Sequence, residues 1–189
     1  MYKQCRTEES SGRQRQLEQG LLQVMLKKRY EEISVTDLCR ELEIPRKAFY
    51  RYFSDKDGAL QSLVDHAIMD YDSYATGNNI LELQDAQKYM EENLSYWINR
   101  KDLLDALAKS NLSGILTQQA IRYTQELDSI PLVMPGADNR LRNYGTLFVV
   151  SGLMAMIVQW HQDGFYPEVE QMAAALLRLL NEPLFSSGK

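Results

Sequence analysis

The chain has 189 residues, 44% hydrophobic and 25% charged, which is enough to bury a core in one or two domains. Its two cysteines, Cys5 and Cys39, exclude a disulfide framework and a cysteine metal site, and they favour a reducing compartment. The net charge of −5 is unevenly spread: residues 1–60 hold 12 Lys and Arg against 10 Asp and Glu, whereas residues 61–189 hold 9 against 16. Because phosphate contacts depend on local charge, an acidic total does not exclude nucleic-acid binding.

The N-terminal part of the chain predicts a polar arm followed by a helix. Residues 1–12 are mostly polar and charged, so we expect a flexible arm and not a signal peptide. A helix is predicted over residues 13–28, where four apolar side chains recur on one face: Leu17, Leu21, Val24 and Met25. We therefore expect a cytoplasmic protein whose folded part begins near residue 13.

Residues 34–45 predict a short helix with a defined start and stop. Ser34 followed by Asp37 is a capping-box pattern, in which the serine oxygen accepts a hydrogen bond from the third backbone amide. Leu38, Cys39 and Leu42 then form an apolar stripe at helical spacing. Pro45 ends this helix, because it disfavours helical geometry at the preceding residue, and it suits the start of another.

The next helix, starting at Arg46, has one apolar and one basic face. Phe49 and Phe53, four residues apart, are expected to point inward, which leaves Arg46, Lys47, Tyr50 and Arg51 outside. Ser54 and Asp57 repeat the start signal, so a third helix is predicted from Asp55. Its positive end and Lys56 together form a candidate phosphate site.

Two short helices joined by a tight turn, with a basic second helix, are typical of a helix-turn-helix that enters the DNA major groove. The run from Phe49 to Lys56 resembles the signature of the tetracycline-repressor (TetR) family, and the similarity covers roughly residues 13–63, including Gly20, Tyr30 and Ile33. Glu43 departs from the family, which often has glycine in the turn. Pro45 and Ala48 replace a common serine and threonine. Together the basic face and the resemblance imply DNA contacts by eight residues: Thr36, Arg46, Lys47, Ala48, Tyr50, Arg51, Tyr52 and Lys56.

The remaining sequence predicts further helices. They are expected over residues 55–74, 85–99, 103–110, 113–127, 140–163 and 167–181, with a proline-rich loop at 129–138. Residues 143–162 carry no formal charge, but their mainly apolar stretch, 147–158, is too short to span a bilayer and fits a buried core helix. The predicted fold is all-α, with a three-helix helix-turn-helix domain at 13–60 and a helical ligand-binding and dimerisation domain at 61–189.

The last two predicted helices are strongly apolar. The first has small residues where another helix can approach, among them Gly145 and Gly152, and the second has an apolar stripe that begins at Val169. They form either the core of a monomer or a four-helix dimer interface across a two-fold axis. The second interpretation also follows from a looser TetR resemblance of this region. The predicted dimer residues are Gly152, Met156, Met172, Leu176, Leu177 and Leu180.

The TetR resemblance also implies a small-molecule pocket inside the C-terminal helices. Aromatic side chains are frequent there, and we expect Trp97, Tyr123 and Phe148 to line the pocket. The expected partners are therefore a double-stranded DNA operator, a second copy of the chain and an unidentified small-molecule effector, with no membrane. Aromatic residues at helical spacing are, however, more often core residues than pocket walls.

The sequence gives no sign of catalysis. His66 and His161 lack neighbouring ligands at metal-binding spacing, and no phosphate-binding glycine loop, G-x-S-x-G or H-E-x-x-H motif is present, so no metal, cofactor or enzymatic activity is expected. The leading hypothesis is a homodimeric, ligand-responsive transcriptional repressor. One alternative is a TetR-like activator or adaptor that responds to a protein partner. The other is a helical enzyme with a vestigial DNA-binding domain.

Overall fold

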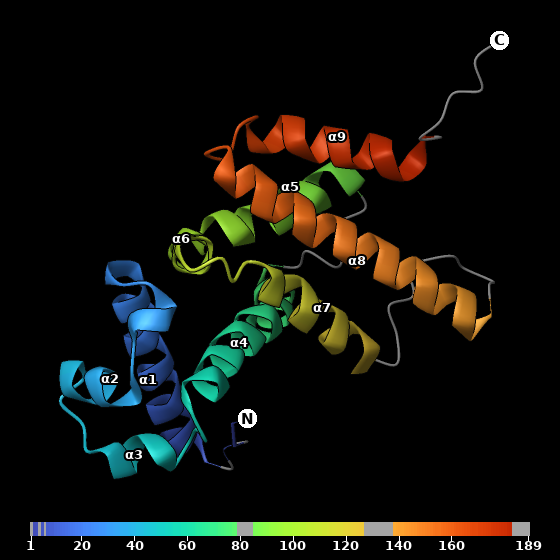
Figure 1. The fold of residues 1–189 in the computed structure, drawn as a ribbon. Helices are drawn as coiled ribbons and strands as arrows, with labels where there is room; N and C mark the ends of the chain where they lie inside the picture. The colour runs from blue at the N-terminus through green and yellow to red at the C-terminus, as the bar shows by residue number, and fades with distance from the viewer. Residues whose placement is uncertain (1, 4, 6, 79–84, 127–137, 183–189) are drawn as a thin grey trace.

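The computed structural model describes residues 2, 3, 5, 7–78, 85–126 and 138–182. Across these residues the secondary structure is helical, apart from one isolated antiparallel bridge between Tyr2 and Phe53. The elements in chain order are α1 Glu8–Lys27, η1 Tyr30–Glu32, α2 Val35–Glu41, α3 Arg46–Tyr50, α4 Lys56–Gly77, α5 Ala86–Ile98, α6 Lys101–Lys109, α7 Gly114–Glu126, α8 Asn139–Gln162 and α9 Val169–Asn181. Figure 1 shows α1–α3 at one end, with α4 leading from them to the bundle of α5–α9. The predicted all-α fold class is confirmed.

Helix α1 starts five residues before the predicted position. The side chain of Thr7 accepts a hydrogen bond of 3.2 Å from the amide of Ser10, and Glu8 and Glu9 occupy the first turn, where they complement the helix dipole. Residues 8–12 of the expected flexible arm are therefore helical. The predicted apolar face is confirmed, because Leu17, Leu21, Val24 and Met25 are all buried.

The helix-turn-helix forms as the start and stop signals predict. Ser34 caps α2 by accepting a hydrogen bond of 3.1 Å from the amide of Asp37. The turn passes through Glu43, whose φ of 53° lies in the left-handed region that glycine adopts without strain. Pro45 then precedes α3 with the extended backbone typical of a proline at a helix entrance. The departure from glycine noted in the sequence therefore falls on the residue that requires a left-handed backbone.

Helix α4 links the two parts of the molecule. Its cap is Asp55, whose carboxylate accepts a hydrogen bond of 2.7 Å from the amide of Gly58, so the helix begins at Lys56, one residue later than predicted. It ends at Gly77, three residues after the predicted end at residue 74. It packs against α1 on one side and against α7 on the other.

In the C-terminal region, α5 packs on α9 and α7 packs on α8. The carboxylates of Asp85 and Asp138 accept hydrogen bonds from first-turn backbone amides of α5 and α8. Aspartate is a favoured residue at this N-terminal cap position, because its short side chain reaches those amides. Gly164, at φ 71°, follows the end of α8. Pro167, expected in the first turn of α9, lies two residues before that helix, and its carbonyl accepts a hydrogen bond of 2.7 Å from the indole of Trp160. Most of the predicted 129–138 loop lies outside the described residues.

Helix α8 is less covered than a core helix. The sequence predicted burial on most sides, but only Met154, Ile157 and Trp160 are buried along its 24 residues. By length and composition it is also the one helix among the described residues that could cross a membrane, and 11% of its most apolar window is buried. The expectation of a core helix is therefore wrong for a single copy of the chain, because α8 packs along one face and leaves the others open.

Candidate nucleic-acid interface and neighbouring cavities

The orientation of α3 is set by two buried phenylalanines. Phe49 and Phe53 are 0% and 1% exposed, and their ring centroids lie 5.2 Å apart. Burial of two aromatic side chains contributes several kcal/mol in order of magnitude, by about 25 cal/mol per Å² of apolar surface. Because the two rings hold one side of α3 in the core, the opposite side of this short helix faces solvent.

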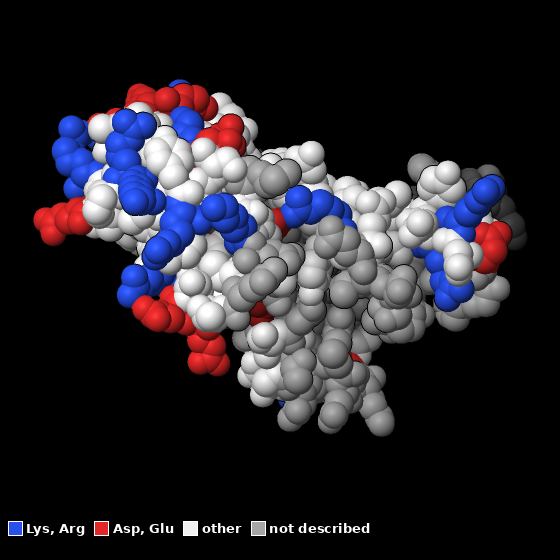
Figure 2. Space-filling model, turned by 90° about the horizontal axis from the view of Figure 1, so that it is seen from below, with Lys and Arg blue, Asp and Glu red and all other residues white. Residues whose placement is uncertain are grey.

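The solvent-facing side of α3 carries donors suited to DNA. Arg46, Lys47, Tyr50 and Arg51 are exposed, as predicted. The guanidinium of Arg46 donates a hydrogen bond of 3.2 Å to the hydroxyl of Tyr50 and lies 5.7 Å from its ring centroid. Guanidinium and ammonium groups can bind phosphate or the major-groove edge of guanine. Figure 2 shows that Lys and Arg gather at the end of the molecule that carries α3.

Two further predicted DNA residues belong to the helix-turn-helix. Thr36, on α2, is exposed, and Ala48 is half-buried on α3. Both are short side chains, so they leave room for a nucleic-acid backbone to approach the amides around them. Six of the eight predicted residues are thus exposed or half-buried: Thr36 on α2, Arg46, Lys47, Ala48 and Tyr50 on α3, and Arg51 directly after it.

Tyr52 is not part of this face. It is 5% exposed, and its backbone carbonyl accepts a hydrogen bond of 3.0 Å from the amide of Lys3. The prediction failed because the helical turn continues past Tyr50, with the amides of Tyr52 and Phe53 both donating to the Phe49 carbonyl, and residues at i, i+3 and i+4 share one face, so Tyr52 is buried with the two phenylalanines.

Lys56 is not a free phosphate ligand either. Its ammonium donates hydrogen bonds of 2.8 and 2.9 Å to the carbonyl oxygens of Tyr30 and Ile33, and it lies 4.3 Å from the ring centroid of Tyr30. All three interactions satisfy the ammonium inside the protein. The predicted phosphate role is therefore replaced by a structural one, in which Lys56 holds the start of α4 against η1.

The three predicted ligand-binding aromatics do not meet. Trp97 is 3% exposed in the core, Tyr123 lines a cavity beside α1 and α4, and Phe148 is 68% exposed on α8. Composition indicated aromatic residues in this region, but it does not determine which helices pack together. The expectation that these three residues form one pocket is therefore wrong.

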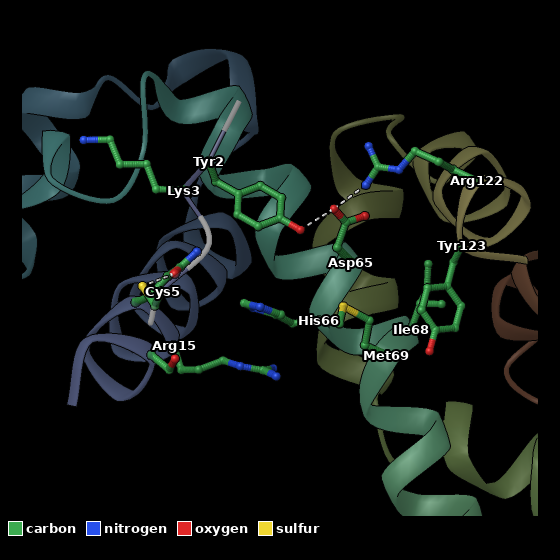
Figure 3. A pocket seen from close by; sticks show the side chains of 12 residues that line it. Tyr2, Lys3, Cys5, Arg15, Asp65, His66, Ile68, Met69, Arg122 and Tyr123 are labelled. Carbon is green, nitrogen blue, oxygen red and sulfur yellow. Dashed lines mark hydrogen bonds and ion pairs between the residues drawn. The ribbon is translucent and has the colours of Figure 1, made fainter. Parts of the chain in front are cut away.

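A cavity of about 370 Å³ lies where the N-terminal segment meets α1, α4 and α7. Its lining mixes charged, polar and apolar side chains (Figure 3): Tyr2, Lys3, Cys5, Ser11, Gln14, Arg15, Asp65, His66, Ile68, Met69, Arg122 and Tyr123. The sequence analysis missed it, because its residues come from four segments. The only local signal was the polar pair Asp65–His66 in an otherwise apolar part of α4.

Hydrogen bonds cross this cavity between its walls. The Tyr2 hydroxyl donates a hydrogen bond of 2.8 Å to the Asp65 carboxylate, which also accepts from the guanidinium of Arg122. Burial, and then the hydrogen bond to Asp65, raise the pKa of the Tyr2 phenol, so it remains a donor. Asp65 therefore joins the N-terminal segment to α7.

Buried polar residues under the cavity fasten α1 to α4. Gln14 donates a hydrogen bond of 2.8 Å to the hydroxyl of Ser62, which donates one of 2.6 Å to the carboxylate of Glu18. The same carboxylate lies 2.8 Å from Nδ1 of His66. A satisfied buried network of this kind fixes the relative position of two helices, because shifting either one would leave polar groups unpaired.

A second, apolar cavity of about 170 Å³ lies between α8 and α9. Four of the six predicted dimer residues line it: Gly152, Met156, Leu176 and Leu180. Met172 and Leu177 are half-buried on α9. Large apolar side chains remain exposed around this groove, among them Phe148 at 68% and Leu180 at 49%.

Within the described residues, no three His, Cys, Asp or Glu side chains are grouped so that they could hold a metal ion. His161, at the end of α8, instead lies 2.7 Å from a carboxylate oxygen of Asp105 on α6. This pairing is consistent with a structural histidine, whose ring nitrogen fixes one helix against another.

No protein-family model and no curated protein matches the chain by sequence. Solved structures of three transcription regulators do share its fold. The dihydroxyacetone kinase operon activator DhaS is 17% identical, with 89% of this chain and 93% of that chain covered and a TM-score of 0.52. The fatty acid degradation regulator FadR from Bacillus halodurans is 14% identical, with 91% and 96% covered and a TM-score of 0.58.

The third structure is the transcriptional regulator FadR from Bacillus subtilis in complex with stearoyl-CoA. It is 16% identical, with 88% of this chain and 96% of that chain covered and a TM-score of 0.55. At these identities the likeness concerns the fold, and it extends over nearly the whole chain, the helix-turn-helix and the C-terminal helices alike. The chain therefore has the all-helical architecture of these regulators, with an N-terminal helix-turn-helix and a C-terminal helical domain.

Proposed function

We propose that this protein is a DNA-binding transcriptional regulator of the TetR type that reads its operator with α3. The observation that carries the proposal is the division of α3 into two sides: Phe49 is buried, together with Phe53 just after the helix, whereas Arg46, Lys47 and Tyr50 are exposed. A short helix anchored in this way can enter the major groove with its basic side forward. The shared fold with three transcription regulators supports the same function.

We propose further that the working unit is a homodimer formed by α8 and α9. One recognition helix reads only a few base pairs, and a two-fold dimer matches an inverted repeat with half-sites about 34–36 Å, or a multiple of this, apart. An apolar groove with Phe148 and Leu180 exposed beside it would be unfavourable in water and is stabilised when a second copy covers it. This interface also accounts for the low burial of α8, and it favours a cytoplasmic regulator over a membrane protein.

A small-molecule effector would act through α4. This helix packs against α1 and against α7, so a change around α7 is transmitted to the DNA-binding helices. The effector can shift the equilibrium only by its different affinity for the two arrangements, typically about 1–3 kcal/mol, and DNA must weaken effector binding equally. We propose that the protein is a repressor that leaves its operator when the effector binds. The stearoyl-CoA bound by the Bacillus subtilis regulator is a precedent for a small-molecule ligand in this fold.

The alternative is an activator or adaptor that responds to a protein partner. It is supported by one of the structural neighbours, the operon activator DhaS, which has the same fold. The two possibilities differ in the effect of DNA binding on transcription. Deletion of the gene raises transcription of the neighbouring genes if the protein is a repressor, and lowers it if the protein is an activator. An enzyme is not proposed, because the three structural neighbours are transcription regulators.

Capture of genomic DNA by the purified protein tests the proposal. The wild-type protein should enrich a small set of fragments that share an inverted repeat. The Arg46→Ala/Lys47→Ala variant should lose the enrichment, while Lys88→Ala, which removes an exposed charge on α5, outside α3 and outside the two helices of the proposed dimer interface, should keep it. Equal fragment recovery by the wild type and the Arg46→Ala/Lys47→Ala variant would refute DNA reading by α3.

A further inference from the structure

We propose that the cavity between the N-terminal segment, α1, α4 and α7 binds a compact uncharged molecule that carries a hydroxyl group on an apolar body, an alcohol or a phenol. The polar contact is the Nε2 atom of His66. This site is separate from the aromatic pocket expected from the sequence, which does not form. Ligand binding can be measured without DNA, and only a role of the cavity as an effector site rests on the proposed function.

The charges around the cavity are paired within the protein. Arg122 donates to the carboxylate of Asp65. Two N–H groups of Arg15 donate to the carboxylate of Asp70, each at 2.8 Å. The third basic residue of the lining, Lys3, directs its ammonium away from the cavity (Figure 3). A charged ligand would lose its hydration here without meeting a free opposite charge, so the lining favours a neutral ligand.

His66 presents one unused polar atom to the cavity. Its Nδ1 atom lies 3.0 and 2.8 Å from the two carboxylate oxygens of Glu18. Because a carboxylate only accepts, Nδ1 carries the ring hydrogen, and Nε2 of the neutral imidazole is left as an acceptor. Among the described residues, none donates a hydrogen bond to this Nε2 atom. His66 lines the cavity, so the hydroxyl of a ligand can donate to it there.

The imidazole is held in place before a ligand arrives. Glu18 is 1% exposed, and it also accepts a hydrogen bond of 2.6 Å from the hydroxyl of Ser62. On another side of the imidazole, the ring of Tyr2 has its centroid 6.0 Å from that of His66. Rotating the imidazole would remove a donor from the buried carboxylate, which costs free energy. A preorganised acceptor of this kind reduces the ordering cost of binding.

The rest of the cavity suits a compact apolar body. Ile68 and Met69, on α4, and Tyr123, on α7, contribute apolar surface to its lining. Met69 is 45% exposed, so a ligand that covers it removes apolar surface from water. The volume of about 370 Å³ lies within the range of small-molecule pockets, roughly 300–1,000 Å³.

The position of the cavity connects a bound ligand to α3. Tyr2, in the wall of the cavity, forms the bridge with Phe53, shortly after α3 ends. The Tyr2 hydroxyl donates to Asp65, which also accepts from Arg122 on α7. A molecule bound against His66 and Tyr2 therefore lies beside the segment that is attached to the end of the recognition helix. We expect its binding to alter operator affinity for this reason.

The test observes His66 directly. The chain has two histidines, so protein labelled with ¹⁵N-histidine gives ring signals from His66 and His161 only, and either His66→Gln or His161→Gln assigns both. His161 is paired with Asp105 on α6 and does not line the cavity, so it is an internal control. In the free protein at mildly alkaline pH, we expect the ring hydrogen of His66 on Nδ1. A hydrogen on Nε2 would overturn the proposal.

Four aryl probes of similar size separate the classes of ligand: 2-phenylethanol, its methyl ether, phenylacetate and phenethylamine. The alcohol should shift the Nε2 signal of His66 with a Kd below about 5 mM and leave His161 unchanged. The ether lacks the donating hydrogen, so it should bind about two- to tenfold more weakly, the range of one hydrogen bond. The two ions should not saturate the site below about 5 mM. Equal binding of alcohol and ether, tighter binding of either ion, or an unmoved His66 signal would refute the proposal.

Two variants locate the probe. Met69→Ala should weaken binding of 2-phenylethanol about threefold or more, because it removes apolar surface from the lining. The side chain is already 45% exposed, so the variant should fold. Tyr144→Ala, at a side chain 70% exposed on α8 and outside the cavity, should bind as the wild type does. Equal affinities of the two variants would place the probe elsewhere and contradict the proposal.

The outcome is distinguishable from that of the proposed function. If 2-phenylethanol binds at His66 and genomic DNA is not captured, the site stands and the regulator is wrong. If DNA is captured and the probe does not bind, the regulator stands and the site is wrong. With both positive, saturating 2-phenylethanol should change operator affinity at least about fivefold, the lower end of typical allosteric coupling. An unchanged operator affinity would show that the cavity is not an effector site.

Discussion

The ammonium of Lys56 lies between the carbonyl oxygen of Tyr30, at 2.8 Å, and the ring of the same tyrosine, whose centroid is 4.3 Å away. Tyr30 is buried, and its hydroxyl donates a hydrogen bond of 2.6 Å to Asp57, one residue after Lys56. Burial, and then Asp57, raise the pKa of the Tyr30 phenol, so it stays protonated and keeps donating. One tyrosine thus meets two consecutive residues at the start of α4 and fixes this helix against the helix-turn-helix.

Lys56→Met should therefore destabilise the protein. The substitution keeps the aliphatic stem and removes the ammonium, leaving the Tyr30 and Ile33 carbonyls without this donor. We expect the free energy of unfolding to fall by about 1.5–3 kcal/mol, the range for hydrogen bonds to charged groups, measured by urea denaturation. Lys47→Met, on the exposed side of α3, should stay within about 0.5 kcal/mol of the wild type.

The same two variants should behave in the opposite way with DNA. Lys47→Met should lower the slope of log K against log salt by about one, because one phosphate contact is lost, and Lys56→Met should leave the slope of the folded protein nearly unchanged. A Lys56→Met protein as stable as the wild type, with its salt slope reduced by one, would restore the phosphate role and contradict the structure.

Arg46→Ala should relax the sequence preference of the protein. Arg46 is exposed, and its contact to Tyr50 orients the guanidinium on the groove side of α3. A bidentate contact to guanine discriminates by about 1–3 kcal/mol, so the loss should fall on one operator position and leave the others unchanged. Fluorescence anisotropy with the captured operator and its single-base variants measures this, with Lys88→Ala on α5 as the control. A uniform loss at every position would identify Arg46 as a phosphate contact instead.

Leu180→Glu should separate the dimer without unfolding the chain. Leu180 is 49% exposed in one copy and lines the groove between α8 and α9, so a carboxylate there is hydrated in the monomer and desolvated in the proposed interface. Sedimentation velocity should show a wild-type dimer and a folded monomeric variant. Tyr166→Glu, at a side chain 74% exposed outside both helices, should remain dimeric. A wild-type monomer at micromolar concentration would exclude this interface.

Gly20→Ala and Gly12→Ala form a matched pair on α1. A Cβ at Gly20 would lie 2.7 Å from Cδ1 and 3.0 Å from Cγ of Leu42, whereas at Gly12 it would meet nothing within 4 Å. Both changes gain helix propensity, but only the first forces α1 away from α2. We expect Gly20→Ala to be less stable than Gly12→Ala by about 1–3 kcal/mol in urea denaturation. Equal stabilities would mean that Leu42 moves aside at no cost.

The sequence correctly predicted those features of the helix-turn-helix that depend on residues close together along the chain. The Ser34 cap, the stop at Pro45 and the inward Phe49 and Phe53 all follow from local spacing, and all are observed. The cap of α1 was missed although Thr7 precedes two acidic residues, a pattern that favours a helix start. The flexible arm over residues 1–12 was predicted from its polar composition alone, and this prediction is wrong for residues 8–12.

The misassigned site residues depend on partners far away in the sequence. Lys56 finds its acceptors 26 and 23 residues earlier, and no spacing rule indicates them. Trp97, Tyr123 and Phe148 were grouped by residue type, but α5 packs on α9 and α7 on α8, which separates them. The cavity at the N-terminal segment was missed for the same reason, since Tyr2 and Asp65 meet across 63 positions.

The pairing of the N-terminal segment with the end of α3 has a practical consequence for how the protein is produced. Tyr2 bridges Phe53 and bonds to Asp65, and Lys3 bonds to Tyr52, so any residues fused ahead of Tyr2 emerge beside the recognition helix and at the edge of the cavity. A purification tag placed there would lie against the proposed DNA-binding face and the edge of the cavity, and a polyhistidine tag would add basic groups beside both at mildly acidic pH. A tag after the last residue, or removal of the leader by a protease, keeps both surfaces in their native form.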